Sequence, residues 1–454
     1  MLTDEKRRHM FGVSDGKQGR DVDRALMARS AKAGVETAGM DAALERVLRP
    51  GQTIVLGQGE GLPTSVMRAL PRHLAALRGS TIVVGLVPID FPELPGTSIR
   101  TFFPSGPLGS RAGMTARNAR YIRQSLYEFA SGLRHGSVIP DVTILRTSLP
   151  REGRVSLGLN VDFGHAAAEC ADVLLLEVDS EACWTGASSS VAIDGRTVVV
   201  AAERPVENPG GDSAVERRPR SASDDRLSAH LAEVIPDGSH LQVGFGQWTS
   251  LVSDAVADLR QIHLQTGQID QWVLPMLDAG SLNGDSRITA TAVVPNDDVL
   301  RALRSVGPLE LEPADVTHAP SAFARLPSFV AINSVFEVDL LGNVNCEFGP
   351  GDRLGGVGGL PDFAKGAHLH PRGLSVIALR AESRGASRIV PHLPPGRVSV
   401  PGDFVDAVVT DVGVAHVRGL GAEERAAALR AIAARHHRES LRAPDHNHRK
   451  EPHR

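Results

Sequence analysis

Residues 50–59 read PGQTIVLGQG and residues 236–246 read PDGSHLQVGFG, and this pair of similar segments decides the fold. Each segment ends a short apolar run at a Gly-x-Gly turn. Each then leads into a helix-like stretch, at residues 65–70 in one case and 250–256 in the other. A strand, a glycine turn and a helix in this order open a βαβ unit. Because the pattern occurs twice, we predict an α/β fold with two related open-sheet domains.

Further segments have the composition of strands, and several are apolar throughout instead of alternating. They are residues 80–86, 142–146, 173–178, 198–202, 329–332, 374–379 and 407–410. Continuous apolar runs are typical of parallel strands that are buried on both faces. Strands that alternate with helices favour parallel sheets in an α/β protein.

The domain boundary is predicted from composition. Residues 205–225 are rich in Pro, Gly, Ser and charge and have no apolar period, as expected of a linker. We therefore expect an N-terminal extension over residues 1–40, an N-terminal domain over 41–215 and a C-terminal domain over 225–436, ending in a helix at 421–435. The tail over 437–454 is expected to be disordered.

Composition excludes several classes of protein. The 454 residues carry a net charge of −4 with both signs interspersed, which gives no reason to expect nucleic-acid binding. The three cysteines have no metal-ligand spacing and suit a reducing cytosol. There is no apolar run long enough for a membrane span, and no signal peptide is indicated. We expect a cytoplasmic protein without a bound metal or redox cofactor. The segment from residue 436 onward holds five of the seventeen histidines, and we expect no defined metal site there.

A strand and a glycine-rich loop in the C-terminal half carry the candidate chemistry. Residues 331–345 (AINSVFEVDLLGNVN) predict an alternating strand with one carboxylate, Glu337. Residues 355–363 (GGVGGLPDF) follow, with four glycines among the first five. Glycine lets backbone N–H groups approach a phosphate or a developing oxyanion closely. The alternative is an ordinary tight turn between a strand and a helix.

These segments resemble the acetyl-CoA hydrolase/transferase family, which includes 4-hydroxybutyrate and acetate CoA-transferases. The resemblance extends to residues 155–163 (VSLGLNVDF), 241–246 (LQVGFG), 387–396 (SRIVPHLPPG) and 408–420 (VVTDVGVAHVRGL), in family order. It implies two domains of the CoA-transferase type with an acyl-CoA held between them. It also implies acyl-CoA and a small carboxylate as partners, with coenzyme A as a substrate and no separate cofactor. The sequence does not decide whether the protein forms a homodimer.

The chain departs from the family pattern at three positions of the implied site. The family transfers CoA through a glutamate that attacks the thioester, and the matching block, residues 264–280, has Gly267 at that position. An asparagine that helps to bind the thioester oxygen is replaced by His318. The family's Gly-Gly-Gln loop reads Gly358-Gly359-Leu360 here.

The departures suggest a changed mechanism. Without a glutamate side chain, a water has room to attack the thioester, and His318 is a candidate general base because histidine titrates near neutrality. The backbone N–H groups of Gly358 and Gly359 would hold the oxyanion. The reaction would be hydrolysis to carboxylate and CoA. The alternatives for His318 are a polar loop residue or a neutral oxyanion donor.

Other candidate residues have weaker signals. Glu337 is expected to support the site, with direct chemistry as the alternative. The second Gly-x-Gly turn, Gly244 and Gly246, is expected to bind acyl-CoA, together with Gly267, Gly356 and Arg388. An orthodox CoA-transferase with a relocated nucleophile and a non-catalytic acyl-CoA-binding protein remain as alternatives. The acyl group is not specified by the sequence.

Overall fold

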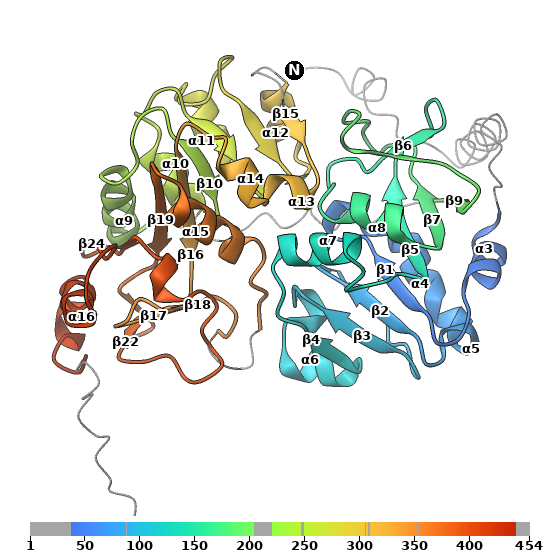
Figure 1. Ribbon diagram of the computed structural model, residues 1–454, viewed down its shortest axis with the longest axis horizontal. Helices are drawn as coiled ribbons and strands as arrows, with labels where there is room; N and C mark the ends of the chain where they lie inside the picture. Colours follow the sequence, from blue (N-terminus) through green and yellow to red (C-terminus); the bar gives the residue numbers. More distant parts are fainter. Residues whose placement is uncertain are drawn as a thin grey trace, which may run out of the picture.

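The computed structural model describes residues 38–441, apart from residues 88, 204–219, 247–248, 305, 307–308, 350 and 352–353. The described residues form two α/β halves that lie side by side, the first drawn in blue to green and the second in yellow-green to red (Figure 1). Each half is built on one large sheet.

The N-terminal half contains a seven-stranded sheet in the order β4-β3-β2-β1-β5-β7-β9, and every pair in it is parallel. Its strands are β1 (Thr53–Leu56), β2 (Thr81–Val84), β3 (Ser98–Thr101), β4 (Ala119–Tyr121), β5 (Val142–Thr147), β7 (Val173–Val178) and β9 (Thr197–Ala201). Its helices are α3 (Met40–Val47), η1 (Gly59–Gly61), α4 (Thr64–Ala69), η2 (Leu70–His73), α5 (Leu74–Leu77), η3 (Gly106–Leu108), α6 (Arg111–Ala116), α7 (Leu126–Arg134) and α8 (Gly164–Cys170).

The C-terminal half contains an eight-stranded sheet in the order β15-β13-β11-β10-β16-β19-β23-β24, in which the final pair, β23 and β24, is antiparallel. Its strands are β10 (His240–Val243), β11 (His263–Gln265), β13 (Ile288–Ala290), β15 (Leu309–Leu311), β16 (Phe329–Ser334), β19 (Gly373–Ala378), β23 (Ala407–Val409) and β24 (Val414–His416). Its helices are α9 (Ala222–Ala232), α10 (Thr249–Ala255), α11 (Val273–Asp278), α12 (Asp297–Leu303), α13 (Ala314–Thr317), α14 (Pro320–Phe323), α15 (Leu360–Leu369), η4 (Gly402–Phe404), α16 (Ala422–Ala431) and η5 (Arg435–His437).

The two sheets have the same order of strands. In each half the first strand lies inside the sheet, the next three extend to one side and the following three extend to the other, and the C-terminal sheet has β24 as an additional edge strand. The two central strands, β1 and β10, are the ones that precede the two Gly-x-Gly turns. The prediction of two related open-sheet α/β domains is therefore confirmed. Strands that the sequence analysis missed, such as β4 and β15, are short and lie at the sheet edges, where an apolar run is not required.

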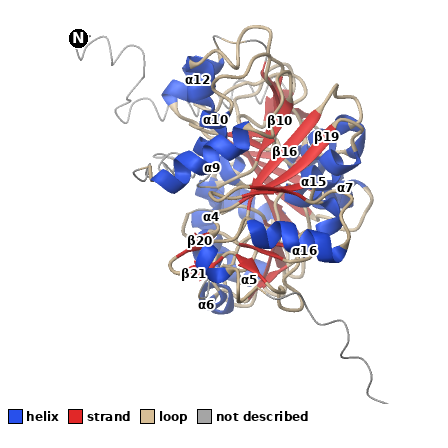
Figure 2. Ribbon diagram, turned by 90° about the vertical axis from the view of Figure 1, so that its left-hand side faces the viewer, coloured by secondary structure: helices blue, strands red, loops and turns tan. Residues whose placement is uncertain are grey.

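The large sheets are covered by helices on both faces. Figure 2 shows α9 and α10 on one face of the C-terminal sheet and α15 on the other. Leu241 of β10 packs in the cluster that contains residues of α9 and α10. Phe329 of β16 packs instead with Phe363 and Ala367 of α15. Burial on both faces explains why these strands read as continuous apolar runs.

Shorter strands form four small sheets. β6 (Arg154–Ser156) pairs with β8 (Ser190–Ala192), and β12 (Gln268–Ile269) pairs with β14 (Ala292–Val293). β20 (Glu382–Ser383) and β21 (Ala386–Ser387) form a hairpin. β17 (Glu337–Asp339) lies between β18 (Val344–Asn345) and β22 (Ile389–Val390).

The expectation of one alternating strand over residues 331–345 is wrong. The chain leaves the large sheet after Ser334, and Glu337 begins β17 in a separate three-stranded sheet. β17 turns back onto β18 through Gly342, whose φ is +84°. It also pairs with β22, a partner about 50 residues later in the chain that periodicity cannot reveal.

The predicted ends of the C-terminal domain also differ in detail. Helix α9 starts at Ala222, behind a Ser221 and Asp224 capping box, so its first turn lies in the segment predicted as linker. Helix α16 ends at Ala431, and η5 follows. In the predicted tail, Leu441 is buried. Residues 1–37, 204–219 and 442–454, which include most of the predicted extension, linker and tail, lie outside the described residues.

No described helix exceeds the 11 residues of α9, and none has the length and apolarity that a membrane-crossing helix of about 20 residues would need.

Backbone hydrogen bonds join the two halves. Val161 N–H donates to Thr291 O over 2.9 Å, and Ala314 N–H donates to Asp162 O over 2.8 Å. At a second point, Leu126 N–H donates to Gly358 O over 3.0 Å. The glycine-rich loop of the C-terminal half is thus fixed against helix α7 of the N-terminal half.

Candidate functional site

His318 lies between two glycines that the sequence analysis assigned to the site. It follows helix α13 and is 1% exposed. A Cβ atom added to Gly267 would lie 3.5 Å from His318 Nε2, and one added to Gly359 would lie 2.5 Å from the same atom. The Nε2 edge of the ring therefore faces the backbone of both glycines. The structure brings together these three positions, which are separated in sequence.

The surroundings of His318 favour a neutral imidazole. Burial lowers the pKa of His318 to about 3. Its Nδ1 lies 2.7 Å from Thr317 Oγ1, and its ring centre lies 4.3 Å from that of Phe363. The Thr317 carbonyl accepts a hydrogen bond of 2.9 Å from Gln265 Nε2 of β11, which fixes His318 beside the end of that strand.

The loop before helix α15 offers backbone donors next to this ring. Gly358 has φ of +54°, a conformation that favours glycine, and Gly359 is the N-cap of α15. Among the described residues, no hydrogen bond uses the N–H of Gly358 or of Gly359. Donors at the start of a helix are suited to an anion or an oxyanion. The next residue, Leu360, is buried in the apolar core of the C-terminal half and adds no polar group.

Gly267 is rigidly held through its carbonyl group. Its oxygen accepts hydrogen bonds from Thr291 N, Ala292 N and Thr291 Oγ1, over 3.0, 3.0 and 2.6 Å. The residue is partly exposed. Asp270, the nearest carboxylate along the chain, accepts a hydrogen bond of 2.9 Å from Trp272 N at the start of α11. That carboxylate is thus held in the turn that leads into α11.

Phe103 of the N-terminal half is a site residue whose position the sequence could not give. A Cβ atom on Gly356 would lie 2.7 Å from Phe103 Cα, and one on Gly358 would lie 3.1 Å from Phe103 Cε2. The Phe103 ring is 6.2 Å from that of Phe245, which is 59% exposed. Glycine at both loop positions permits this close approach. The position of Phe103 depends on how the halves dock, which no local pattern encodes.

The second Gly-x-Gly turn lies at the carboxyl ends of β10 and β16. A Cβ atom on Gly244 would lie 2.6 Å from Asn333 Oδ1, and Gly246 has φ of +134° with Ser334 Oγ 3.2 Å from its added Cβ. Ligands of open α/β sheets bind at such carboxyl ends. Phe245 connects this turn to Phe103 and hence to the loop at Gly356.

Glu337 begins β17, and Arg388 immediately precedes β22, the neighbouring strand of the small sheet. Val338 N–H donates to Arg388 O over 2.9 Å. Glu337 Oε2 accepts a hydrogen bond of 2.9 Å from Asn345 Nδ2, across the β17–β18 hairpin. Within the part of the chain that the structure describes, no hydrogen bond or ion pair connects either side chain to His318 or to the glycine-rich loop.

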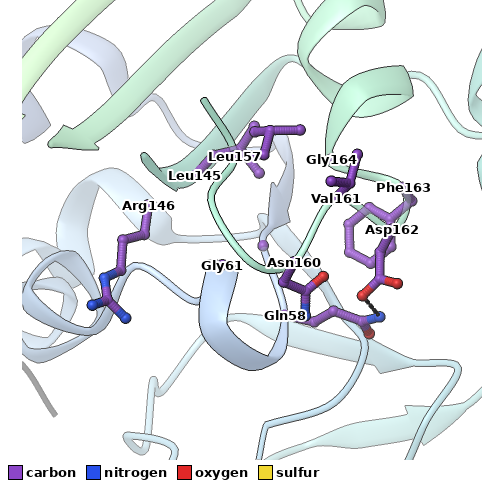
Figure 3. A pocket seen from close by; sticks show the side chains of 11 residues that line it. Gln58, Gly61, Leu145, Arg146, Leu157, Asn160, Val161, Asp162, Phe163 and Gly164 are labelled. Atoms are coloured by element: carbon purple, nitrogen blue, oxygen red, sulfur yellow. Dashed lines mark hydrogen bonds between the residues drawn. The ribbon is translucent and has the colours of Figure 1, made fainter. Parts of the chain in front are cut away.

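The first Gly-x-Gly turn is packed against the same half of the chain. The Asn160 side chain lies over Gly59, where an added Cβ atom would be 2.5 Å from its Nδ2. Gln58 Nε2 donates to Asp162 Oδ2 over 2.6 Å, and both residues line a cavity of about 10 Å³. Figure 3 shows this hydrogen bond beside the cavity. Burial raises the pKa of Asp162 to about 6. A cavity of this size holds about one water.

Asp362 connects helix α15 to the N-terminal half. Its Oδ1 is 2.6 Å from Ser125 Oγ, and its Oδ2 accepts a hydrogen bond of 3.2 Å from Tyr127 N at the start of helix α7. Burial raises the pKa of Asp362 to about 7, against these two hydrogen bonds; the charge of Glu128 raises it further and that of Lys365 lowers it. Asp362 is three residues after Gly359, and its carboxyl group helps to hold the glycine-rich loop and α15 against the N-terminal half.

Asp362→Asn is predicted to change the pH dependence of stability. The folded state raises the pKa of Asp362, so the protonated carboxyl group stabilises the folded state. This stabilisation is fully present below about pH 4 and is lost as the pH rises through 7. The asparagine variant cannot titrate. Between about pH 5 and pH 8, the apparent Tm of the wild type should therefore fall by roughly 2–5 °C relative to the variant. Thermal unfolding of both proteins across this pH range tests the prediction. A Tm difference between them that stays constant, or a wild-type Tm that rises relative to the variant, would contradict it.

Comparison with known proteins finds a family match in the C-terminal half and several similar enzymes. Residues 298–444 match the acetyl-CoA hydrolase/transferase C-terminal domain. The chain is 27% identical over 404 residues to the 4-hydroxybutyrate coenzyme A transferase of Clostridium kluyveri, which covers 86% of this chain and 92% of that protein. It is 27% identical over 257 residues to the acetyl-CoA hydrolase of Candida albicans, covering 52% of this chain and 47% of that protein.

Solved structures show the same fold. The crystal structure of 4-hydroxybutyrate CoA-transferase from Porphyromonas gingivalis superposes with a TM-score of 0.70 at 26% identity, over 89% of this chain and 96% of that one. The fold is therefore of the CoA-transferase type.

Proposed function

We propose that this chain, whose residues 298–444 belong to the acetyl-CoA hydrolase/transferase family, is an acyl-CoA thioester enzyme that transfers the acyl group to water. The products would be a short-chain carboxylate and free coenzyme A, made in the cytoplasm. One observation carries the choice of water as acceptor. The resemblance assigns the family's glutamate to the position of Gly267, and His318, which also contacts the N-terminus of α15, faces that glycine.

The empty position supports attack by water. Gly267 is partly exposed, its carbonyl group is fixed by three hydrogen bonds, and one oxygen of Asp270 accepts a hydrogen bond from Trp272 N. A water in the space of the missing side chain would be held beside a thioester bound against Phe103 and Phe245. It would attack the thioester carbonyl, the C–S bond would break, and the thiolate of coenzyme A would leave and take up one proton of the water, while the other proton passes to solvent as the acid ionises.

The N–H groups of Gly358 and Gly359 are proposed as the oxyanion hole. They lie just before the first turn of α15, with Gly359 as its N-cap, and have no partner among the described residues. An oxyanion donor contributes about 10²–10³ in kcat, and an oxyanion hole with substrate binding gives roughly 10³–10⁴ over the uncatalysed reaction. A modest hydrolase therefore needs no covalent nucleophile.

His318 is proposed to act as a neutral hydrogen-bond donor from Nε2 to the same oxyanion, with the Thr317 hydroxyl donating to Nδ1 so that Nε2 carries the ring proton. A base with a pKa of about 3 takes up a proton at pH 7 at a cost of about 5 kcal/mol, whereas donation from the neutral ring requires no proton uptake. The donor role of His318 is therefore favoured over the general-base role. The donor role also matches the asparagine that the family has at this position.

Thiol release tests the proposed reaction. The purified protein is incubated with acetyl-, butyryl-, succinyl- and 4-hydroxybutyryl-CoA, with and without acetate, and free thiol is followed with a chromogenic reagent. We expect thiol release from at least one substrate at a rate that does not depend on acetate. Exchange of CoA onto acetate, with no thiol released in its absence, would contradict the proposal.

His318→Asn and His318→Ala separate the two roles of the histidine. If Nε2 donates a hydrogen bond, the asparagine amide replaces it, and thiol release stays within about tenfold of wild type, while alanine loses about 10²–10³. If His318 takes the proton of water, both variants lose activity to the same extent. The kcat of the three proteins on one acyl-CoA decides between them.

A second candidate function is a CoA-transferase with a relocated nucleophile. It is favoured by the relative from Clostridium kluyveri, which is named as a transferase and is covered over most of its length. Glu337 is the carboxylate to examine, although Asn345 holds one of its oxygens. Trapping with hydroxylamine during turnover, followed by mass spectrometry of the peptide that contains Glu337, would identify such an intermediate.

A further inference from the structure

Three metal-ligating side chains meet at the end of the described chain. Glu382 lies on β20, and His436 and His437 lie on η5. Glu382 Oε2 is 2.6 Å from His436 Nε2 and 3.1 Å from His437 Nε2. One ligand atom from each residue can be chosen so that all three lie within 4.8 Å of one another. The sequence analysis noted a histidine-rich end but could not know that a carboxylate from the β20–β21 hairpin faces it.

The two histidines are on an anchored turn. Arg438 Nε donates to Ala433 O over 3.0 Å, and Arg430 Nε donates to Leu441 O over 2.6 Å. Leu441 is buried in the cluster that contains Leu429 and Ile432 of the C-terminal half. These contacts hold η5 against the end of α16, so ordering the two imidazoles for a ligand costs less conformational entropy than it would in a free tail.

Two of the three distances between ligand atoms are close to those of a tetrahedral site. Bonds of about 2.0–2.1 Å from zinc to nitrogen or oxygen place neighbouring ligand atoms roughly 3.3 Å apart. The two nitrogen–oxygen distances of 2.6 and 3.1 Å are near this value, and small rotations of the exposed His436 ring can correct the difference. Both nitrogens approach the same carboxylate oxygen, so a cation placed among the three atoms would be bonded by all of them.

We propose that Glu382, His436 and His437 form a binding site for a divalent transition-metal ion of the zinc type. Two imidazoles and one carboxylate are ligands that such ions prefer, and a water would complete four-coordination. The bound ion would connect the β20–β21 hairpin to the C-terminal turn η5. This inference does not depend on the proposed thioester chemistry.

Metal titration of the full chain tests the site. After chelator treatment, the protein competes for Zn²⁺ with a chromophoric chelator, and Co²⁺ is added separately to record its visible spectrum. We expect one equivalent of Zn²⁺ with a dissociation constant of about 10⁻⁶ M or below, and Co²⁺ bands of four-coordinate intensity. Binding no tighter than about 10⁻³ M would overturn the proposal.

Variants distinguish this site from the remaining histidines of the tail. Glu382→Gln and His436→Gln should each weaken Zn²⁺ binding by at least tenfold. His436 is 68% exposed, so its replacement should not disturb folding. The control is the triple variant His446→Gln, His448→Gln and His453→Gln, which changes residues C-terminal to the site and should bind Zn²⁺ as the wild type does. Loss of binding in this control, with full binding retained in His436→Gln, would overturn the assignment.

Discussion

Gly267→Glu is expected to convert this protein into a CoA-transferase that requires a carboxylate acceptor. The substitution restores a carboxylate where the family has its nucleophile. A Cβ atom at Gly267 meets His318 Nε2 at 3.5 Å and Phe363 Cε2 at 3.7 Å, which are ordinary contacts. The φ of Gly267 is not positive, so a residue with a side chain can adopt its backbone conformation.

The expected chemistry follows from a restored nucleophile. The new carboxylate would attack the thioester carbonyl and expel the CoA thiolate. The thiolate would then attack the glutamyl carbonyl of the resulting anhydride and release the substrate's acyl group as a carboxylate. Exchange of CoA onto acetate should rise at least about tenfold above wild type, with a glutamyl-CoA adduct at residue 267 that hydroxylamine traps.

Gly267→Gln is the matched control, because it has nearly the same size and no nucleophilic oxygen. Its exchange rate should equal that of the wild type. If the glutamine and glutamate variants exchange CoA equally, then residue 267 does not lie at the thioester, and the alignment of the site with the family is wrong.

Gly359→Ala is expected to abolish most of the activity and to lower stability. An alanine Cβ would lie 2.5 Å from His318 Nε2, 2.7 Å from His318 Cδ2 and 2.9 Å from Phe363 Cε2. The buried His318 ring would have to move. Such overpacking costs about 1–3 kcal/mol, and a displacement of about 1 Å in a catalytic group costs roughly 10²-fold in rate.

The effect of Gly359→Ala can be separated from a backbone effect. Gly359 has φ of −89°, which alanine adopts without strain, so the clash with His318 is the cause of the expected loss. Gly267→Ala places a methyl group near the same Nε2 atom at an ordinary 3.5 Å and should keep the wild-type Tm. Thermal unfolding and kcat of both variants check the contrast. Equal behaviour of the two variants would mean that His318 is not packed between these glycines.

Much of the fold was predictable because its signal is local. The two Gly-x-Gly turns follow β1 and β10, and the apolar runs at residues 142–146, 173–178 and 329–332 all fall in the large sheets. The break after Ser334 was not predictable, because β17 is stabilised by pairing with β22, which is distant in sequence. Pairing of this kind depends on the whole fold and leaves no periodic pattern.

The site was predictable in part for a similar reason. Gly267 and His318 could be selected as departures within matching blocks, and Gly358 and Gly359 as matches, and the structure places Gly267 and Gly359 against His318. The roles of Phe103 and Asp362 depend on how the two halves dock, which no single segment records. The burial that lowers the pKa of His318 also comes from tertiary packing, mainly against Phe363, and it changes the role that a histidine at this position is expected to play.

The central claim, that water and no protein carboxylate receives the acyl group, can be tested in a single turnover. Protein in excess over acyl-CoA reacts in H₂¹⁸O, and the carboxylate product is analysed by mass spectrometry. Direct attack by water places one ¹⁸O atom in the carboxylate in this first turnover. An unlabelled carboxylate would mean that its second oxygen came from a side chain of the protein, and the proposed mechanism would be contradicted.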